Sequence, residues 1–168
     1  MRLGTYLMVL AGLVALQVLL LADMNLFRGI LVPAIYPLFI LLLPFVIGRV
    51  QLLFAGFGVG LLVDVLMGTG GVHAMASTFL AFVRPHLVEL ISPRGRDMGV
   101  APRPGVQDAS WFAGYLVFGF AAHHLVWVLV EYWSLAIVGK ALLRWVVSTL
   151  VSAGLAGALL TAFKRTRR

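Results

Sequence analysis

Charged residues divide this sequence into apolar stretches that each approach the length of a membrane-spanning helix. An α-helix rises 1.5 Å per residue, so roughly 20 apolar residues cross about 30 Å of hydrocarbon. The chain is 62% hydrophobic and 11% charged, whereas soluble domains contain about 25% charged residues. We therefore expect hydrocarbon to surround most of the chain, and we predict an all-α, polytopic integral membrane protein.

The boundaries of these stretches predict about six transmembrane helices in a single domain, residues 1–168. The first stretch exceeds the roughly 7–15 apolar residues of a cleavable signal sequence, which favours an uncleaved span. Pro33, Pro37 and Pro44 in the second stretch predict kinks or an irregular path. Residues 92–110 are polar and rich in Pro, Gly and Arg, which predicts an exposed loop. The predicted spans are 3–22, 29–48, 50–67, 72–91, 111–130 and 141–163.

Basic residues predict the orientation of the chain, because Lys and Arg are enriched in cytoplasmic segments. With six spans and a cytoplasmic amino terminus, ten of the thirteen Lys and Arg residues fall inside. Both termini and loop 92–110 are then cytoplasmic. A re-entrant hairpin over residues 50–91 would give four spans with the same orientation, so charge leaves both topologies open. The basic residues lie at segment ends without interleaved aromatic residues, so no nucleic-acid partner is expected.

Five ionisable side chains in or near the predicted spans fall at a similar depth, toward the outer side. Such groups need a polar partner or a watery cavity inside a membrane. A proton or metal site is one interpretation, but the spacing matches no zinc motif such as HExxH. We favour a structural hydrogen-bonded clasp that fixes a turn at Gly68, Gly70 and Gly71. The clasp residues are Asp64, His73, His123, His124 and Glu131.

Basic residues of the fourth span and of the following loop are predicted to anchor the chain at the cytoplasmic surface. Arg84 can extend its guanidinium toward lipid headgroups while its aliphatic stem stays in the apolar layer. An ion pair with Glu89 is the alternative, although a five-residue spacing places the two about 140° apart around a helix. The expected anchors are Arg84, Arg94 and Arg96.

Small residues at four-residue spacing predict close helix contacts. Gly56 and Gly60 form such a pair in the third span, and Ser148, Ser152 and Ala156 form a row in the last. The partner helices belong either to this chain's own bundle, which we favour, or to another protein.

The sequence offers little support for an enzyme. It has no GxSxG elbow, no glycine loop ending in GKS or GKT, and no acidic cluster suited to Mg²⁺. The chain has no cysteine, which removes disulfides, thiolate metal sites and cysteine nucleophiles. We expect no catalytic residue, cofactor or metal. An intramembrane enzyme that uses His123 or His124 as a base is the weakest alternative.

Residues 58–74 read GVGLLVDVLMGTGGVHA, which is a Gly-Leu-Leu-x-Asp run, a glycine turn and a Gly-x-His-Ala-like restart. This run resembles the rod shape-determining protein MreD family, which shows the same features in the same order. Residues 78–85, TFLAFVRP, and residues 92–94, SPR, resemble the branch with a longer cytoplasmic loop. His123, His124 and Glu131 add to the likeness. One departure is the Gly-Val pair before His73, where many members have Leu-Gly.

The resemblance implies a non-enzymatic membrane scaffold of the bacterial cell-wall elongation (rod) complex, the elongasome, which serves peptidoglycan synthesis and regulation of cell shape. It implies a place in the inner (cytoplasmic) membrane and binding to MreC. Through MreC the chain would link the MreB filament indirectly to RodA and its partner transpeptidase. The family is also similar in fold to the six-helix substrate-binding subunits of energy-coupling-factor transporters. The alternative function is therefore that of a vitamin-type transporter subunit.

Overall fold

The protein is described by a computed structural model over residues 3–21, 30–92, 101–102, 106–131 and 138–166. Five helical stretches within these ranges are long and apolar enough to cross a membrane. The predicted polytopic, all-helical membrane protein is thus confirmed, with five such helices where about six were predicted. The elements are α1 (Leu3–Leu16), the π-helical η1 (Gln17–Leu21), α2 (Leu38–Leu42), α3 (Arg49–Met67), α4 (Val72–Ile91), α5 (Ala109–Glu131) and α6 (Val138–Thr166).

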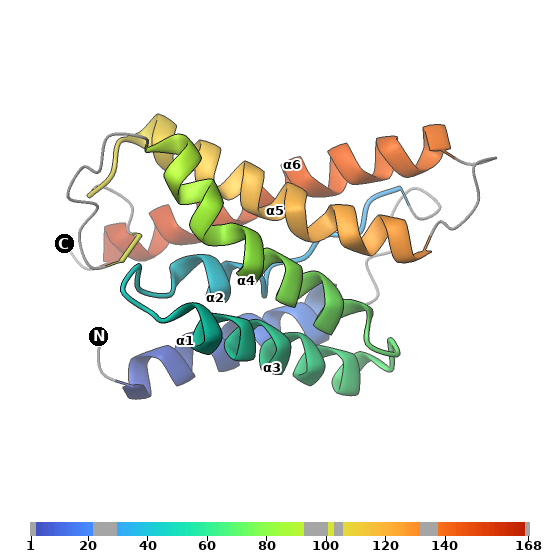
Figure 1. Ribbon diagram of the computed structural model, residues 1–168, viewed down its shortest axis with the longest axis horizontal. Coiled ribbons are helices and arrows are strands. Elements are labelled where there is room, and N and C mark those ends of the chain that lie inside the picture. Colours follow the sequence, from blue (N-terminus) through green and yellow to red (C-terminus); the bar gives the residue numbers. More distant parts are fainter. Residues whose placement is uncertain (1–2, 22–29, 93–100, 103–105, 132–137, 167–168) are drawn as a thin grey trace.

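The long helices lie roughly antiparallel along the bundle. α1, α3 and α5 run in one direction, and α4 and α6 run back, so the start of α1 and the end of α6 lie at the same end (Figure 1). We call this the terminal end, and the end that carries the α3–α4 connection the turn end. Because α1 and α3 run in the same direction, the chain must return between them. Residues 30–48 make that return, so the chain passes along the bundle six times.

The second of these passes departs from the predicted helix. Residues 31–35 form no helix and run as an uncoiled stretch (Figure 1), and α2 contributes only five helical residues. The cause is the prolines, which lack a backbone N–H and clash with a preceding helical turn. Pro37 is the N-cap of α2, and Pro44 directly follows its C-cap, Leu43, where ψ is 151°. A proline-rich stretch of sufficient apolar length therefore makes the pass without a long helix.

Residues 30–36, which we call the extended segment, run inside the bundle, where backbone groups cannot bond to water. Hydroxyl groups of α6 take the place of water. The Val32 amide donates to Ser148 Oγ at 3.1 Å, and the Ala34 amide donates to Ser152 Oγ at 2.9 Å. α6 thus supplies side-chain acceptors to backbone that has no helical or sheet partner.

Gln17 of η1, which precedes the extended segment in the sequence, also bonds to its backbone. Its side-chain oxygen accepts from the Ile35 amide at 2.8 Å, and its Nε2 donates to the Pro33 carbonyl at 3.3 Å. Gln17 is only 2% exposed. A primary amide carries both a donor and an acceptor, so one buried side chain satisfies two backbone groups at once.

The row of small residues in α6 therefore does not pack on a second helix in the way its spacing predicted. Ser148 and Ser152 are fully buried and bond to the extended segment, and Ala156 is fully buried in the core. Small side chains still allow the close approach, but the neighbour at the two serines is extended backbone.

Gly56 and Gly60 bring α3 close to α4 of the same chain. A Cβ atom at Gly60 would lie 2.4 Å from the His73 carbonyl oxygen, and one at Gly56 would lie 2.7 Å from the Ser77 carbonyl oxygen. Any larger side chain would displace the α4 backbone, because interiors at this packing density leave no spare room. The glycine pair thus sets the distance between the two helices.

Large apolar side chains cover the outside of the bundle. Met8 on α1, Phe54 on α3, Leu90 on α4, Leu129 on α5 and Leu150 on α6 are each more than half exposed. Such a surface is unfavourable in water but matches lipid tails, which have similar polarity. The protein is therefore membrane-embedded, with its polar side chains turned inward.

Replacing Ser152 by Ala leaves the Ala34 amide buried without an acceptor. An unpaired buried polar group costs about 1–3 kcal/mol, so we expect S152A to lower the thermal unfolding midpoint of the detergent-solubilised protein. Thr161→Ala is the matched control, because the Thr161 hydroxyl is exposed and bonds to the Ala158 carbonyl of its own helix. Equal midpoints for S152A and T161A would contradict a role for the serine in holding the extended segment.

Candidate functional site

The connection between α3 and α4 is a short turn of glycines. Gly68, Gly70 and Gly71 have φ angles of 68°, 66° and 99°, a region that residues with a Cβ seldom adopt. The Gly68 amide donates to the Asp64 carbonyl at 2.7 Å and ends α3. The chain can therefore reverse within four residues at the turn end.

Asp64 ties the end of α3 to the start of α4. Its Oδ1 accepts from the Thr69 hydroxyl at 2.6 Å and from the His73 amide at 3.1 Å, and its Oδ2 accepts from the Ala74 amide at 2.7 Å. The first amides of a helix have no intrahelical acceptor, and the helix dipole favours negative charge there. The carboxylate, 5% exposed, is thus stabilised by three donors.

Tyr36, at the end of the extended segment, is the centre of a second group of contacts. Its hydroxyl lies 3.1 Å from His73 Nδ1 and 2.6 Å from His123 Nε2, and it accepts from the Ser77 hydroxyl at 3.2 Å. We call these four residues the Tyr36 cluster. All four are at most 3% exposed. The cluster joins the extended segment to α4 and α5.

The remaining two residues of the predicted clasp are His124 and Glu131. His124 lies beside the Tyr36 cluster, whereas Glu131 contacts a different helix. The His124 ring packs edge-on against that of His123 at 5.3 Å, and its Nδ1 lies 2.9 Å from the Phe120 carbonyl oxygen. Glu131 forms an ion pair with Arg144 of α6 at 2.8 Å. The predicted layer therefore divides: Asp64 and His73 share the turn, His73 and His123 share Tyr36, and Glu131 contacts another helix.

Sequence reasoning overlooked Tyr36 and Arg144. Arg144 falls inside the predicted sixth span, 141–163, and inside α6, which begins at Val138, but no partner was predicted for its side chain. The side chain of Arg144 is 5% exposed, and its guanidinium lies 4.6 Å from the centre of the Trp127 ring. The sequence did contain one indication of a buried Arg144, because Glu131 at the end of the preceding span is an acidic partner for it. Tyr36 carried no comparable signal, because its partners are far away in the sequence.

Arg84 lies inside the bundle and does not reach lipid headgroups, contrary to the prediction. It is 2% exposed; its Nε donates to the Tyr115 hydroxyl at 2.7 Å, and its Nη2 donates to the carbonyls of Leu41 and Leu43. The Tyr115 hydroxyl also donates to the Leu41 carbonyl at 2.9 Å. The alternative partner, Glu89, is exposed on α4. Arg94 and Arg96, the other predicted anchors, lie outside the described residues.

The physical reason for burying Arg84 is the end of α2. A helix leaves its last carbonyls without intrahelical donors, and α2 ends within the apolar interior. A guanidinium carries five N–H donors in a fixed fork and stays charged. The Arg84 guanidinium therefore donates to several carbonyls at once. Its positive charge is also stabilised there by the helix dipole, which is negative at the C-terminal end of α2. We call Arg84, Tyr115 and the Leu41 and Leu43 carbonyls the Arg84 cluster.

These clusters do not form a recognisable metal site. Within the described ranges, no three His, Asp or Glu side chains are placed to hold a metal ion. The histidines of the Tyr36 cluster face a phenol, which at neutral pH is a hydrogen-bonding partner for imidazole. The arrangement is suited to hydrogen bonding.

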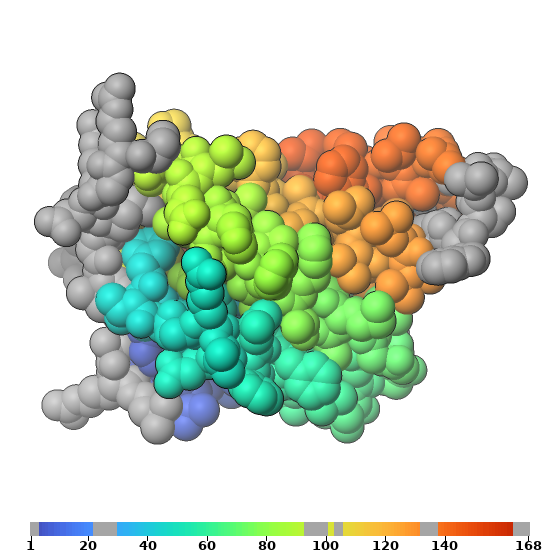
Figure 2. Space-filling model, in the orientation of Figure 1, coloured from blue at the N-terminus to red at the C-terminus, as the bar shows by residue number. Residues whose placement is uncertain are grey.

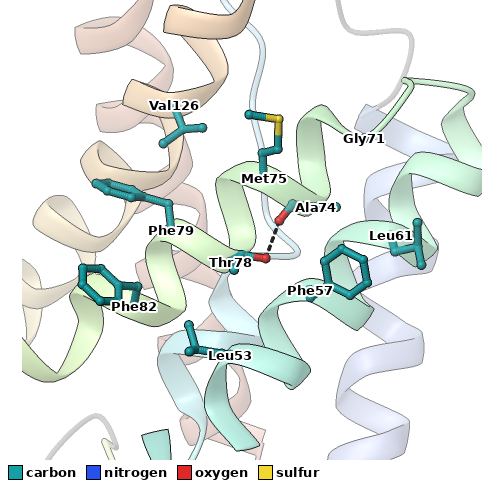
Figure 3. A pocket seen from close by; sticks show the side chains of 10 residues that line it. All are labelled: Leu53, Phe57, Leu61, Gly71, Ala74, Met75, Thr78, Phe79, Phe82 and Val126. Atoms are coloured by element: carbon teal, nitrogen blue, oxygen red, sulfur yellow. Dashed lines mark hydrogen bonds between the residues drawn. The ribbon is translucent and has the colours of Figure 1, made fainter. Parts of the chain in front are cut away.

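The outer face of α3 and α4 carries an apolar groove of about 770 Å³. Figure 2 shows α3 (teal) and α4 (green) side by side across this face. In Figure 3, Thr78 lies between the ring of Phe57 on one side and those of Phe79 and Phe82 on the other. The Thr78 hydroxyl donates to the Ala74 carbonyl at 2.7 Å, so it presents no free donor. The remaining lining residues are Leu53, Leu61, Gly71, Ala74, Met75 and Val126.

Replacing Asp64 by Asn converts one acceptor oxygen into a donor that faces a backbone or hydroxyl donor. We expect D64N to lose about 1–3 kcal/mol of unfolding free energy, measured by denaturant titration in mixed micelles. Thr69→Val removes only one of the three donors and serves as the comparison. A loss in D64N no larger than that in T69V would contradict the assignment of Asp64 as the link between α3 and α4.

Replacing Arg84 by Lys keeps the positive charge but removes the fork that reaches Tyr115 and two carbonyls together. We expect a loss of about 1.5–3 kcal/mol, the range for hydrogen bonds of charged groups, seen as a lower thermal midpoint in detergent. Arg49→Lys, at an exposed position at the start of α3, is the matched control. If R84K were as stable as R49K, a positive charge alone would suffice and the carbonyl contacts would be unimportant.

No family model, curated protein or solved structure matches this chain.

Proposed function

We propose that this protein is a non-enzymatic scaffold of the bacterial cell-wall elongation complex, located in the inner membrane and binding MreC. Residues 58–74, which resemble the MreD family, carry this proposal. In the structure they form the end of α3, the glycine turn and the start of α4. Gly60, Asp64 and His73 within this run make close contacts that other residue types would not reproduce. The resemblance therefore involves residues with separate structural tasks as well as an apolar composition.

The distribution of basic residues supports the orientation in this proposal. With the terminal end in the cytoplasm, the six passes along the bundle leave ten of the thirteen Lys and Arg residues on the cytoplasmic side. Both termini are then cytoplasmic, and the Asp64 turn faces the periplasm. Arg84 contributes to this asymmetry by its position in the sequence, although its side chain bonds inside the bundle.

The groove on α3 and α4 supports a membrane helix as the bound element. Helices in lipid associate through close packing, because lipid tails are as apolar as the side chains. Ala74 and Thr78 form a narrow strip between the larger side chains of Phe57 and Phe79. A single apolar helix can lie along this strip with its side chains against the aromatic rings. In this proposal the occupant is the membrane helix of MreC.

Binding to MreC explains how a bundle without enzymatic motifs contributes to cell shape. MreC, bound through its membrane helix, connects the chain with RodA and its partner transpeptidase. The MreB filament is an indirect partner at the cytoplasmic side. The contribution of this chain is placement of its partners in the membrane, and the rigid contacts around Asp64 suit that task.

Affinity purification from native membranes in mild detergent tests this proposal, and we expect MreC to be recovered with the chain. Thr78→Trp fills the groove, so it should reduce recovery of MreC at least tenfold, a cost of about 1.4 kcal/mol. Leu142→Trp is the matched control, since Leu142 is 54% exposed on α6, away from the groove. Both variants should be compared at equal amounts of folded protein.

The outcomes separate the possible functions. If T78W does not reduce the recovery of MreC, the scaffold function stands, but MreC binds a face of the bundle other than the groove. Recovery of an ATPase partner or a small vitamin-like molecule in place of MreC would contradict the proposal and favour the transporter subunit.

A further inference from the structure

Exposed side chains form a continuous row along α4, which we call the α4 stripe. They recur at alternating spacings of four and three residues, the repeat that lets one helix pack along another. With 3.6 residues per turn, they stay within about 80° of one another around the helix. Figure 3 shows the first three of them beside the groove. The α4 stripe consists of Met75, Phe79, Phe82, His86 and Glu89.

The α4 stripe changes from apolar to polar toward the terminal end. Its first three residues are apolar and line the groove, whereas His86 and Glu89 lie beyond the groove on the same side of α4. Glu89 follows Thr78 of the groove by eleven residues, which is about three turns, so the two lie about 20° apart around the helix. The groove therefore leads to a carboxylate at the terminal end of the bundle.

The carboxylate of Glu89 has no partner among the described residues. It is exposed, and the ion pair of Arg144 with Glu131 is the one that the described part of the chain contains. Glu89 lies in the last turn of α4, which ends at Ile91. The helix dipole is negative there and disfavours an acidic side chain, so α4 itself gains nothing from this charge. The carboxylate is available to a positive group from outside the chain.

We propose that Glu89 binds a basic side chain at the cytoplasmic end of the membrane helix that occupies the groove. This inference rests on the proposed function, which places the terminal end in the cytoplasm and the helix of MreC in the groove. Lys and Arg are enriched at the cytoplasmic ends of membrane helices, so a helix along the α4 stripe brings positive charge to the level of Glu89. The groove provides the apolar contact area, and the ion pair fixes the direction and register of the bound helix.

A positive charge on α3 restricts where the basic side chain of the partner lies. The groove-lining residues of α3 recur every four residues, and Arg49 continues their row by one more turn. Gly56 of α3 lies against Ser77 and Ala81 of α4. Because the two helices are antiparallel, Arg49 lies about level with His86. A basic side chain on the partner is therefore repelled from the α3 side and attracted to the α4 side, which sets the rotation of the bound helix about its own axis.

Charge reversal tests the inference, with affinity purification of the full chain from native membranes as the readout. Glu89→Lys replaces attraction by repulsion, and we expect about fivefold lower recovery of MreC, the size of an exposed ion pair. Asp108→Lys is the matched control, because Asp108 is exposed just before α5 at the same end of the bundle. Recovery with E89K should return when one Lys or Arg at the cytoplasmic end of the MreC helix is replaced by Glu.

Cross-linking tests the register of the helix, since the chain has no native cysteine. Phe82→Cys is combined in turn with single cysteines along the MreC helix, and Leu142→Cys, 54% exposed on α6, is the control. Phe82 and Glu89 are seven residues apart on the α4 stripe. The MreC position that cross-links to F82C should therefore lie about seven residues, or two turns, from the basic residue that restores E89K.

The outcomes distinguish this inference from the proposed function. Equal recovery of MreC with E89K and D108K would overturn the role of Glu89 and leave MreC binding intact. So would a loss in E89K that no charge reversal in MreC restores, or cross-links that form with L142C and not with F82C. Absence of MreC from the wild-type purification would instead contradict the proposed function, and the inference with it.

Discussion

The structure depends on one constraint: backbone N–H and C=O groups inside hydrocarbon must find partners within the protein. Long helices meet this requirement by themselves, but residues 30–36 do not. Their amides and carbonyls bond to Ser148, Ser152 and Gln17. These hydrogen bonds fix the positions of α6 and η1 on either side of the segment. An irregular pass of this kind is tolerated only in the interior of a bundle, and the other helices accordingly surround it.

The same constraint explains the buried charges. Asp64 contacts backbone amides at the start of α4, and Arg84 contacts backbone carbonyls at the end of α2. Each charge thus bonds to the unsatisfied end of a helix, and neither needs an opposite charge for this purpose. The helix dipole favours both placements. Glu131 and Arg144 show the other solution, an ion pair.

Sequence reasoning succeeds here where the signal is local. Apolar runs of about 20 residues identify the five long helices, and nine residues with three glycines suffice to predict that Asp64 and His73 come close. It fails where partners are distant in the sequence. Arg84 bonds to carbonyls about 40 residues away, and a carbonyl has no side-chain signature. Tyr36 meets His123 across 87 residues. The second span was misread because hydropathy measures apolar length and not backbone shape.

The two sides of α4 show how the interior and the surface are related. His73, Ser77, Leu80 and Arg84 recur at spacings of three and four residues and are all buried, while Met75, Phe79 and Phe82 lie on the exposed side. A helix that binds Tyr36 near one end and Tyr115 near the other cannot rotate without breaking both sets of hydrogen bonds. The buried clusters therefore determine which side chains face the lipid. The groove on α3 and α4 is a consequence of polar contacts on the opposite side of the same helix.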